Sequence, residues 1–137
     1  MDKKELIKLA LSAREKAYAP YSHYAVGAAV VGDSGKVYTG CNIENASYPA
    51  GICGERTAIF KAISEGERKI TMIALVAAEE TKTAPLPEYP SPCGICRQVM
   101  AEFCEQDTPV LLAKSEDDYN EYKLCELLPL SFTAKDL

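Results

Sequence analysis

Residues 51–61 have the sequence GICGERTAIFK, in which Cys53 stands two positions before a glutamate at the start of a helical pattern. Apolar side chains then recur every three or four residues, so we predict a helix from Cys53 to about residue 65. Gly66 is a suitable C-terminal cap, because glycine tolerates the left-handed conformation required there. A cysteine and a carboxylate are therefore expected side by side in the first turn of a helix.

The stretch 91–100, SPCGICRQVM, repeats this arrangement, with Cys93 opening a second predicted helix over about 93–105. Between the two helices, residues 70–79 (ITMIALVAAE) are apolar enough to predict a strand that is buried on both faces. Residues 81–92 contain four prolines and are predicted to form an extended loop. Strand and helix thus alternate here, which is typical of an α/β fold.

The remaining elements extend this pattern on both sides. We predict a helix over 3–17, a strand pair within 24–43 that turns at 32–35, a loop over 44–51, a strand over 109–114 and a short helix over 125–129. Together they predict a mixed sheet covered by helices, an α/β sandwich formed by a single domain over 1–137. In such sheets, functional sites gather where strands end and helices begin.

Composition disfavours several classes of function. The chain has 137 residues and a formal net charge of −5, with no dense cluster of lysine and arginine, so we expect no nucleic-acid partner. No apolar run is long enough to span a membrane, and the N-terminus has no signal-peptide pattern. We therefore expect a cytoplasmic protein whose six cysteines are reduced, which favours metal binding or catalysis over disulfides.

Cys93 and Cys96 form a C-x-x-C motif that is compatible with three kinds of site. These are a redox dithiol, a structural zinc site closed by four protein ligands, and a catalytic zinc site with three protein ligands and an open position for water. There is no second C-x-x-C, and the only histidine, His23, lies outside both motifs and is expected to be an ordinary loop residue. The cysteines without a paired spacing are expected to be small buried hydrophobic residues: Cys41, Cys104 and Cys125.

Cys53 is the natural third thiolate, because it also opens a helix. Two helix N-termini would then converge on one metal, where their dipoles stabilise thiolates. Glu55 lies beside this site without being needed as a ligand, which is the position that a general base requires. The combination of Cys53-x-Glu55 with Pro92-Cys93-x-x-Cys96 matches the signature of the zinc-dependent deaminases.

With these motifs, the chain resembles the small, zinc-dependent cytidine deaminases. The resemblance runs almost end to end, through AYAPYSHYAVGAAV, GCNIENASYPAGICGERTA, SPCGICRQVM and ELLPLSF. It implies a three-layer α/β/α sandwich with a mixed five-stranded sheet, and a homotetramer with shared active sites. It also implies an enzyme of pyrimidine salvage that uses one Zn²⁺ per chain to convert cytidine and deoxycytidine to uridine and deoxyuridine, with release of ammonia.

The resemblance further implies roles for individual residues. Glu55 would take a proton from the bound water and deliver it to the base. The implied zinc ligands are Cys53, Cys93 and Cys96. Two residues would hydrogen-bond the ribose, chiefly its 3′-hydroxyl: Asn42 and Glu44. Tyr24 would lie against the pyrimidine. Two further aromatic residues would reach toward the pocket of a neighbouring subunit: Tyr48 and Phe132. Independently, three thiolates leave zinc with a net negative charge, and Arg56 is placed to offset it by donating a hydrogen bond to a sulfur.

Two positions depart from the family pattern. Gly54 stands where the family usually has alanine, which loosens the start of the helix. Tyr24 stands where phenylalanine is frequent, which adds a hydroxyl to the ring. The proline-rich loop before Ser91 is also long for the family. Other functions stay open at this level: a deaminase of another nucleoside or of a free base, a non-catalytic metal or dithiol module, and nucleic-acid editing, which the acidic charge disfavours.

Overall fold

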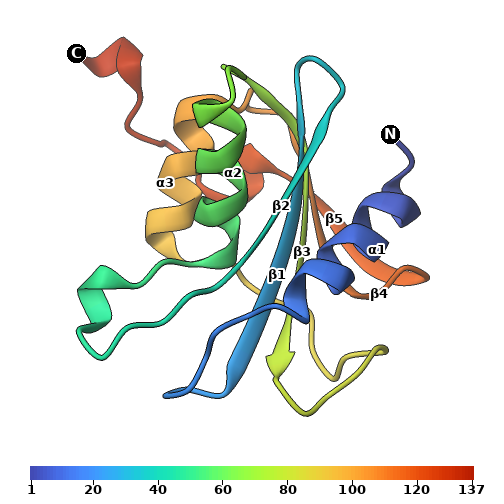
Figure 1. Cartoon of the computed structure of the whole chain (residues 1–137). Coiled ribbons are helices and arrows are strands. Elements are labelled where there is room, and N and C mark those ends of the chain that lie inside the picture. Colours follow the sequence, from blue (N-terminus) through green and yellow to red (C-terminus); the bar gives the residue numbers. More distant parts are fainter.

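The computed structural model describes residues 1–137 and contains one five-stranded sheet with helices on both faces (Figure 1). Its strands are β1 (Tyr24–Gly32), β2 (Val37–Cys41), β3 (Ile70–Glu79), β4 (Pro109–Ser115) and β5 (Asp118–Lys123). Helix α1 (Lys3–Arg14) covers one face, and α2 (Gly54–Ser64) and α3 (Gly94–Phe103) lie next to each other on the other. The three-layer α/β/α sandwich with a mixed five-stranded sheet is therefore confirmed.

The sheet has the strand order β2-β1-β3-β4-β5. Strand β1 pairs antiparallel with β2 and with β3, and β4 pairs antiparallel with β5. Only β3 and β4 are parallel, and α3 lies in the connection between them, because parallel neighbours need a crossover. The chain is completed by a short helix α4 (Leu124–Leu127) and by the 3₁₀ turns Tyr48–Ala50 and Ala134–Asp136.

Two hydrophobic clusters hold the layers together, one on each face of the sheet. Strand β3 contributes to both, because successive side chains of a strand point to opposite faces. Ile73 and Leu75 pack in the cluster that contains Ala58 and Met100, from α2 and α3, whereas Ala74 packs in the cluster that contains residues of α1. The predicted burial of 70–79 on both faces is thus confirmed. Each fully buried Leu or Ile side chain contributes about 1.5–3 kcal/mol to folding.

Two glycines let the helices approach the sheet closely. A Cβ atom on Gly27 of β1 would lie 2.1 Å from the carbonyl oxygen of Ala10 in α1. A Cβ atom on Gly40 of β2 would lie 2.5 Å from the backbone nitrogen of Ala58 in α2. The second approach matters for the site, because it fixes the first turns of α2 against the end of β2.

The secondary structure differs from the sequence-based expectations chiefly at three elements. The first helix ends at Arg14 rather than near residue 17, because the chain that follows bends so that the Tyr18 N–H donates to the carbonyl of Asn42. Strand β5 was not expected from the pattern of its residues, which are mostly polar and lie at the edge of the sheet. The short helix α4 begins one residue earlier than predicted, at Leu124, and ends at Leu127.

The three unpaired cysteines are less buried than predicted. Each is partly exposed, because each lies at the margin of an element: Cys41 at the end of β2, Cys104 directly after α3 and Cys125 in α4. Burial nevertheless raises the pKa of the Cys104 thiol to about 12, so this thiol is unreactive at neutral pH. No helix combines the length and the apolar character that a membrane crossing requires.

Candidate active site

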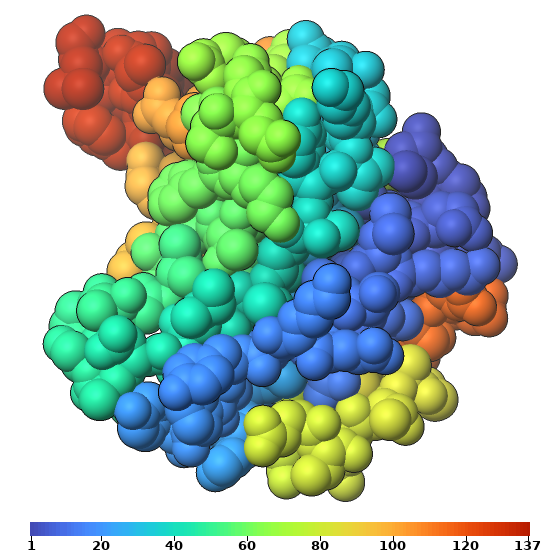
Figure 2. Space-filling model, viewed as in Figure 1, coloured from blue at the N-terminus to red at the C-terminus, as the bar shows by residue number.

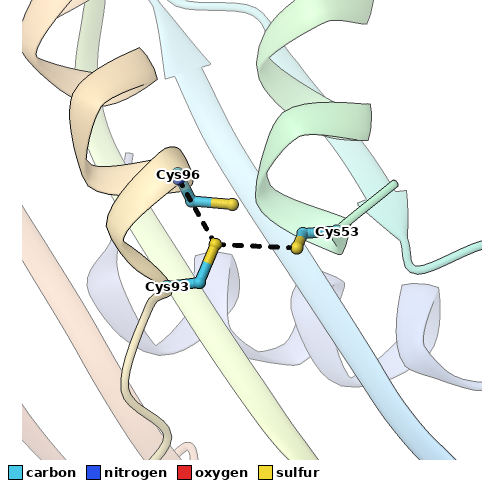
Figure 3. A group of neighbouring side chains, drawn as sticks. All are labelled: Cys53, Cys93 and Cys96. Atoms are coloured by element: carbon cyan, nitrogen blue, oxygen red, sulfur yellow. Dashed lines mark hydrogen bonds between the residues drawn. The ribbon is translucent and has the colours of Figure 1, made fainter. Parts of the chain in front are cut away.

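The sulfur atoms of Cys53, Cys93 and Cys96 point toward one another between the starts of two helices (Figure 3). Cys53 is the N-cap residue of α2, and Cys93 is the N-cap residue of α3. The Sγ atoms of Cys53 and Cys93 are 3.8 Å apart, and the backbone N–H of Cys96 donates to Cys93 Sγ over 3.4 Å. All three ligand atoms lie within 4.8 Å of one another. The predicted convergence of two helix N-termini is therefore present.

This cluster fits a tetrahedral zinc ion. Zinc–sulfur bonds of about 2.3 Å at tetrahedral angles separate neighbouring sulfurs by about 3.8 Å, which matches the distance between Cys53 and Cys93. The group that could hold a metal ion consists of three cysteines, which would leave a fourth coordination position open. Three thiolates with an open position are the donor set of a catalytic rather than a closed structural site.

The contact between Cys53 and Cys96 shifts the pKa values of these two thiols in opposite directions. Hydrogen bonding with Cys96, followed by hydrogen bonds from Arg56 and Cys93, lowers the pKa of Cys53 to about 5. The pKa of Cys96 is raised, chiefly by its contact with Cys53 and then by burial. Two neighbouring sulfurs thus resist ionising together, and a dication held between them removes that repulsion.

Arg56 lies in the first turn of α2 and contacts the cluster. Its Nη2 atom donates to Cys53 Sγ over 3.5 Å, so the predicted contact with a sulfur is present. This hydrogen bond to the Cys53 sulfur is the main reason that the pKa of Arg56 is raised. The Nε atom of Arg56 is buried and has no hydrogen-bond partner. Arg56 therefore holds a fixed positive charge beside the three sulfurs.

A cavity of about 410 Å³ opens beside the cysteines. Cys53 and Cys93 line it, whereas Cys96 is fully buried behind them. Glu55 also lines the cavity with a side chain that is only 4% exposed, and burial raises its pKa to about 6. A buried carboxyl group therefore shares a cavity with two of the three sulfurs, as the Cys-x-Glu spacing predicted.

Asn42 follows directly after β2 and is held by the backbone of β1. Its Oδ1 accepts the N–H of Val26 at 2.9 Å, and its Nδ2 donates to the carbonyl of Tyr24 at 2.8 Å. One amide hydrogen and one lone pair remain free, so the side chain can still donate to and accept from a ligand. Asn42 is buried and lines the cavity.

Glu44 lines the same cavity two residues later. Its Oε1 accepts the backbone N–H groups of Tyr21 and Ser22 at 3.0 and 3.1 Å, and its Oε2 accepts the hydroxyl of Ser22. The hydroxyl of Ser22, together with these two N–H groups, holds the pKa of Glu44 below its usual range. The carboxylate is thus ionised and is anchored by the loop that precedes β1.

The three predicted aromatic contacts differ in position. Tyr24 lines the cavity and is about half exposed, and burial raises the pKa of its hydroxyl. Tyr48 lies at the rim of the cavity of its own chain, 71% exposed, with its ring 6.0 Å from that of Tyr21. Phe132 is not part of this cavity and lies in the C-terminal tail, where its carbonyl accepts a hydrogen bond from Gln98. The reach of Tyr48 and Phe132 into a neighbouring subunit stays a prediction.

Several cavity residues escaped the sequence-based reasoning. Ser22, Pro90 and Ser91 line the cavity, although none of them was assigned a role from the sequence: Ser22 and Ser91 lie inside stretches that resemble the family, and Pro90 lies in the proline-rich loop. The C-terminal end of the proline-rich loop therefore forms part of the cavity wall. His23 belongs neither to the cysteine cluster nor to the cavity lining, and it pairs with Glu80 at 2.9 Å, in agreement with its predicted place in a loop.

Gly54 departs from the family pattern at a crowded position. A Cβ atom there would lie 3.1 Å from Cγ1 of Val26, 3.3 Å from the Val26 carbonyl oxygen and 3.4 Å from the backbone nitrogen of Asn42. These distances require small shifts of the neighbours but no rearrangement. Glycine therefore allows the start of α2 to pack slightly closer to β1 than alanine does.

Sequence comparison finds deaminases among the relatives of this chain. Residues 1–112 match the sequence model of the cytidine and deoxycytidylate deaminase zinc-binding region. The cytidine deaminase of Halalkalibacterium halodurans is 53% identical over 137 residues, which cover 100% of this chain and 98% of the relative. That of Sporosarcina psychrophila is 47% identical over 100% of this chain and 96% of the relative.

Solved structures agree with the sequence comparison. The crystal structure of cytidine deaminase from Burkholderia pseudomallei superimposes with a TM-score of 0.86 at 43% identity, covering 96% of this chain and 100% of that one. The crystal structure of the Mycobacterium tuberculosis enzyme gives a TM-score of 0.80 at 33% identity, covering 96% and 98%. By its fold, its cluster of three cysteines and its likeness over the whole length, the chain belongs to the zinc-binding cytidine and deoxycytidylate deaminase family.

Proposed function

We propose that this protein hydrolytically deaminates cytidine and deoxycytidine to uridine and deoxyuridine with release of ammonia, as an enzyme of pyrimidine salvage in the cytoplasm. The observation that carries the proposal is the buried Glu55 carboxyl group, which shares one cavity with Cys53 and Cys93. The identity of 53% with a cytidine deaminase over the whole chain supports the choice of substrate. Residues 1–137 form the single catalytic domain of this proposal.

Cys53, Cys93 and Cys96 hold the zinc ion in this proposal, one ion per chain. Zinc in such a site acts as a Lewis acid that makes water nucleophilic near neutral pH. The protein contributes the three sulfurs, the helix N-termini behind Cys53 and Cys93, and the charge of Arg56 beside Cys53.

Glu55 moves the protons of the reaction. It accepts one proton from the water whose oxygen forms the new bond to C4 of the pyrimidine, and it passes this proton to N3. It then transfers the second proton of the same water to the amino group, the C4–N bond breaks, and ammonia leaves with uridine as the product. Burial of Glu55 suits this role. Because bulk water has little access to this carboxyl group, its protons are exchanged with the substrate rather than with solvent.

The nucleoside is positioned by the other side of the cavity. Asn42 and Glu44 bind the ribose, chiefly its 3′-hydroxyl, by offering one free amide hydrogen and one free carboxylate lone pair. Tyr24 lies against the pyrimidine ring. Because the 3′-hydroxyl is present in both cytidine and deoxycytidine, this arrangement accepts both nucleosides.

The active form in this proposal is a homotetramer with shared active sites. Figure 2 shows the loop around residues 44–50 and the C-terminal tail projecting from the same side of the molecule, with a hollow between them. Large apolar side chains are exposed on these segments and on α3 between them: Tyr48, Ile95, Leu130 and Phe132. Exposed apolar side chains gathered in this way indicate a protein interface. Tyr48 and Phe132 then reach toward the pocket of a neighbouring subunit.

A substrate panel tests the proposed activity. The purified protein is incubated with cytidine, deoxycytidine, 3′-deoxycytidine and free cytosine, and deamination is followed by the change in ultraviolet absorbance. We expect cytidine and deoxycytidine to react well and cytosine very poorly, because cytosine lacks the sugar that positions C4. Efficient turnover of free cytosine, or of a different nucleoside alone, would assign the enzyme to another substrate.

A further inference from the structure

We infer that Ser22 is a positioning residue that fixes the Glu44 carboxylate for binding of the nucleoside sugar and links it to the part of the site that binds the base. This inference rests on the proposed function, because it assumes that Glu44 contacts the ribose. Ser22 lies in the loop before β1 and lines the cavity.

The contacts of Ser22 run in two directions. Its hydroxyl donates to Glu44 Oε2, and its backbone N–H donates to Glu44 Oε1 at 3.1 Å. The same hydroxyl oxygen accepts the backbone N–H of Tyr24 at 3.0 Å. A continuous chain of hydrogen bonds therefore joins Tyr24, which lies against the base in the proposed function, to Glu44, which binds the sugar.

The lone pairs of Glu44 show what remains for a ligand. Oε1 accepts two backbone N–H groups, from Tyr21 and Ser22, and so has no lone pair left. Oε2 accepts only the hydroxyl of Ser22 and keeps one lone pair. A sugar hydroxyl that donates to Glu44 is thereby directed to Oε2, at an angle that the Ser22 hydroxyl sets. Without this hydroxyl, Oε2 has two free lone pairs and a choice of orientations.

At the opposite end of the sheet, Ser34 and Glu67 make the same set of contacts outside the proposed substrate cavity. The Ser34 hydroxyl donates to Glu67 Oε2, the Ser34 N–H donates to Glu67 Oε1 at 3.1 Å, and the Ser34 oxygen accepts the N–H of Lys36 at 3.2 Å. There the motif only braces the turn between β1 and β2. Ser34→Ala is therefore a matched control, because it removes an equivalent set of contacts far from the substrate.

The experiment compares kcat/KM for cytidine and for 3′-deoxycytidine in the wild type, in Ser22→Ala, Ser22→Thr, Glu44→Ala and Ser34→Ala, and in the double variant that combines Ser22→Ala with Glu44→Ala. Ser22→Ala should reduce the preference for cytidine about tenfold, the size expected when one hydrogen bond to a charged group is lost. Ser22→Thr should retain the preference, because it keeps the hydroxyl. Adding Ser22→Ala to Glu44→Ala should reduce the preference no further, because both changes act on the same contact.

The outcomes separate this inference from the proposed function. Equal kcat/KM for cytidine and 3′-deoxycytidine in the wild type would overturn the ribose role of Glu44 itself. If the wild type prefers cytidine to 3′-deoxycytidine and Ser22→Ala keeps the same preference, only the role of Ser22 would be overturned. A similar loss of preference in Ser34→Ala would also overturn it, since the effect would then be one of general stability. Ser22→Cys, which keeps the size but has a weak donor, provides the same test if Ser22→Ala does not fold.

Discussion

Arg56 Nη2 donates a hydrogen bond to Cys53 Sγ over 3.5 Å, and this places a fixed positive charge beside the cysteine cluster. Three thiolates around Zn²⁺ leave a net negative charge, which makes the metal a poorer Lewis acid. The guanidinium withdraws electron density from one sulfur and so opposes this effect. Arg56→Gln should therefore keep the zinc and lose activity by roughly 10- to 100-fold, as is usual for groups that support metal ligands.

The measurement for Arg56→Gln combines steady-state kinetics with elemental analysis of the same sample. Arg68→Gln is the control, because Arg68 follows the same helix and bonds only to the carbonyls of Ile63 and Glu67. Full activity of Arg56→Gln with zinc in place would show that the charge on the cluster is irrelevant to the reaction.

We expect the metal content to depend on three of the six cysteines. Chelator-free protein should contain about one zinc ion per chain, given one set of three thiolate ligands. Cys53→Ala, Cys93→Ala and Cys96→Ala should each lose most of this zinc, whereas Cys104→Ala should retain it, because Cys104 is not part of the cluster. Elemental analysis gives the metal content, and thiol trapping with and without chelator checks for a redox dithiol. A metal-free protein that deaminates cytidine at the full rate would exclude the zinc mechanism.

Glu55 lies beside the sulfurs but is not a member of the ligand cluster. Glu55→Gln should therefore fold and bind zinc normally while kcat falls by roughly 10²- to 10⁴-fold, the usual size of a general acid–base contribution. Glu65→Gln, at the other end of α2, should behave as the wild type. If zinc were lost together with the Glu55 carboxylate, Glu55 would be a ligand and its assigned role would be wrong.

The assembly can be tested through the C-terminal tail. Light scattering of the purified protein should give the mass of four chains. Phe132→Ala should reduce activity more than it reduces the stability of the folded chain, because Phe132 is 59% exposed and packs little against its own chain. Leu137→Ala, also in the exposed tail, is a suitable control. A monomer with full activity would rule out shared active sites.

The sequence predicted the cysteine site well, because its information is local. Cys53 and Glu55 are two residues apart, and Cys93 and Cys96 are three apart, so each pair is placed by the helix that it opens. Only the close approach of the two helix N-termini depends on the tertiary fold and could not be deduced from local sequence. The layered α/β architecture was predictable for the same reason, since apolar periodicity reports which face of an element is buried.

Other features depend on contacts between distant segments. Ser22 reaches Glu44 across 22 positions, so its contact with that carboxylate could not be read from the stretch 17–30 in which it lies, although that stretch also contains Tyr24. Strand β5 pairs with β4 through its backbone at the sheet edge, so its polar side chains show little of the apolar alternation that identifies a strand. The partial exposure of Cys41 likewise depends on where β2 ends, which composition does not define.

Glu67 gives a prediction about stability and pH. Its buried carboxylate accepts hydrogen bonds from the hydroxyl and N–H of Ser34 and from the hydroxyl of Tyr38, and these hold the pKa of Glu67 below its usual range. In the unfolded chain the pKa returns to about 4.3. The ionised carboxylate therefore stabilises the fold above that pH, and this contribution is lost as the pH falls through the lower pKa of the folded state.

Glu67→Gln should accordingly lower the Tm most at neutral pH. The difference in Tm from the wild type should shrink progressively below about pH 4.3, because protonation makes the Glu67 side chain of the wild type neutral, like glutamine. Thermal unfolding followed by circular dichroism between neutral pH and the acid range measures this convergence. Glu65→Gln is the control, because Glu65 is exposed two residues away, and it should leave the shape of the curve unchanged. A Tm difference that is constant over the whole pH range would show that Glu67 acts through packing rather than through the charge that Ser34 and Tyr38 hold in place.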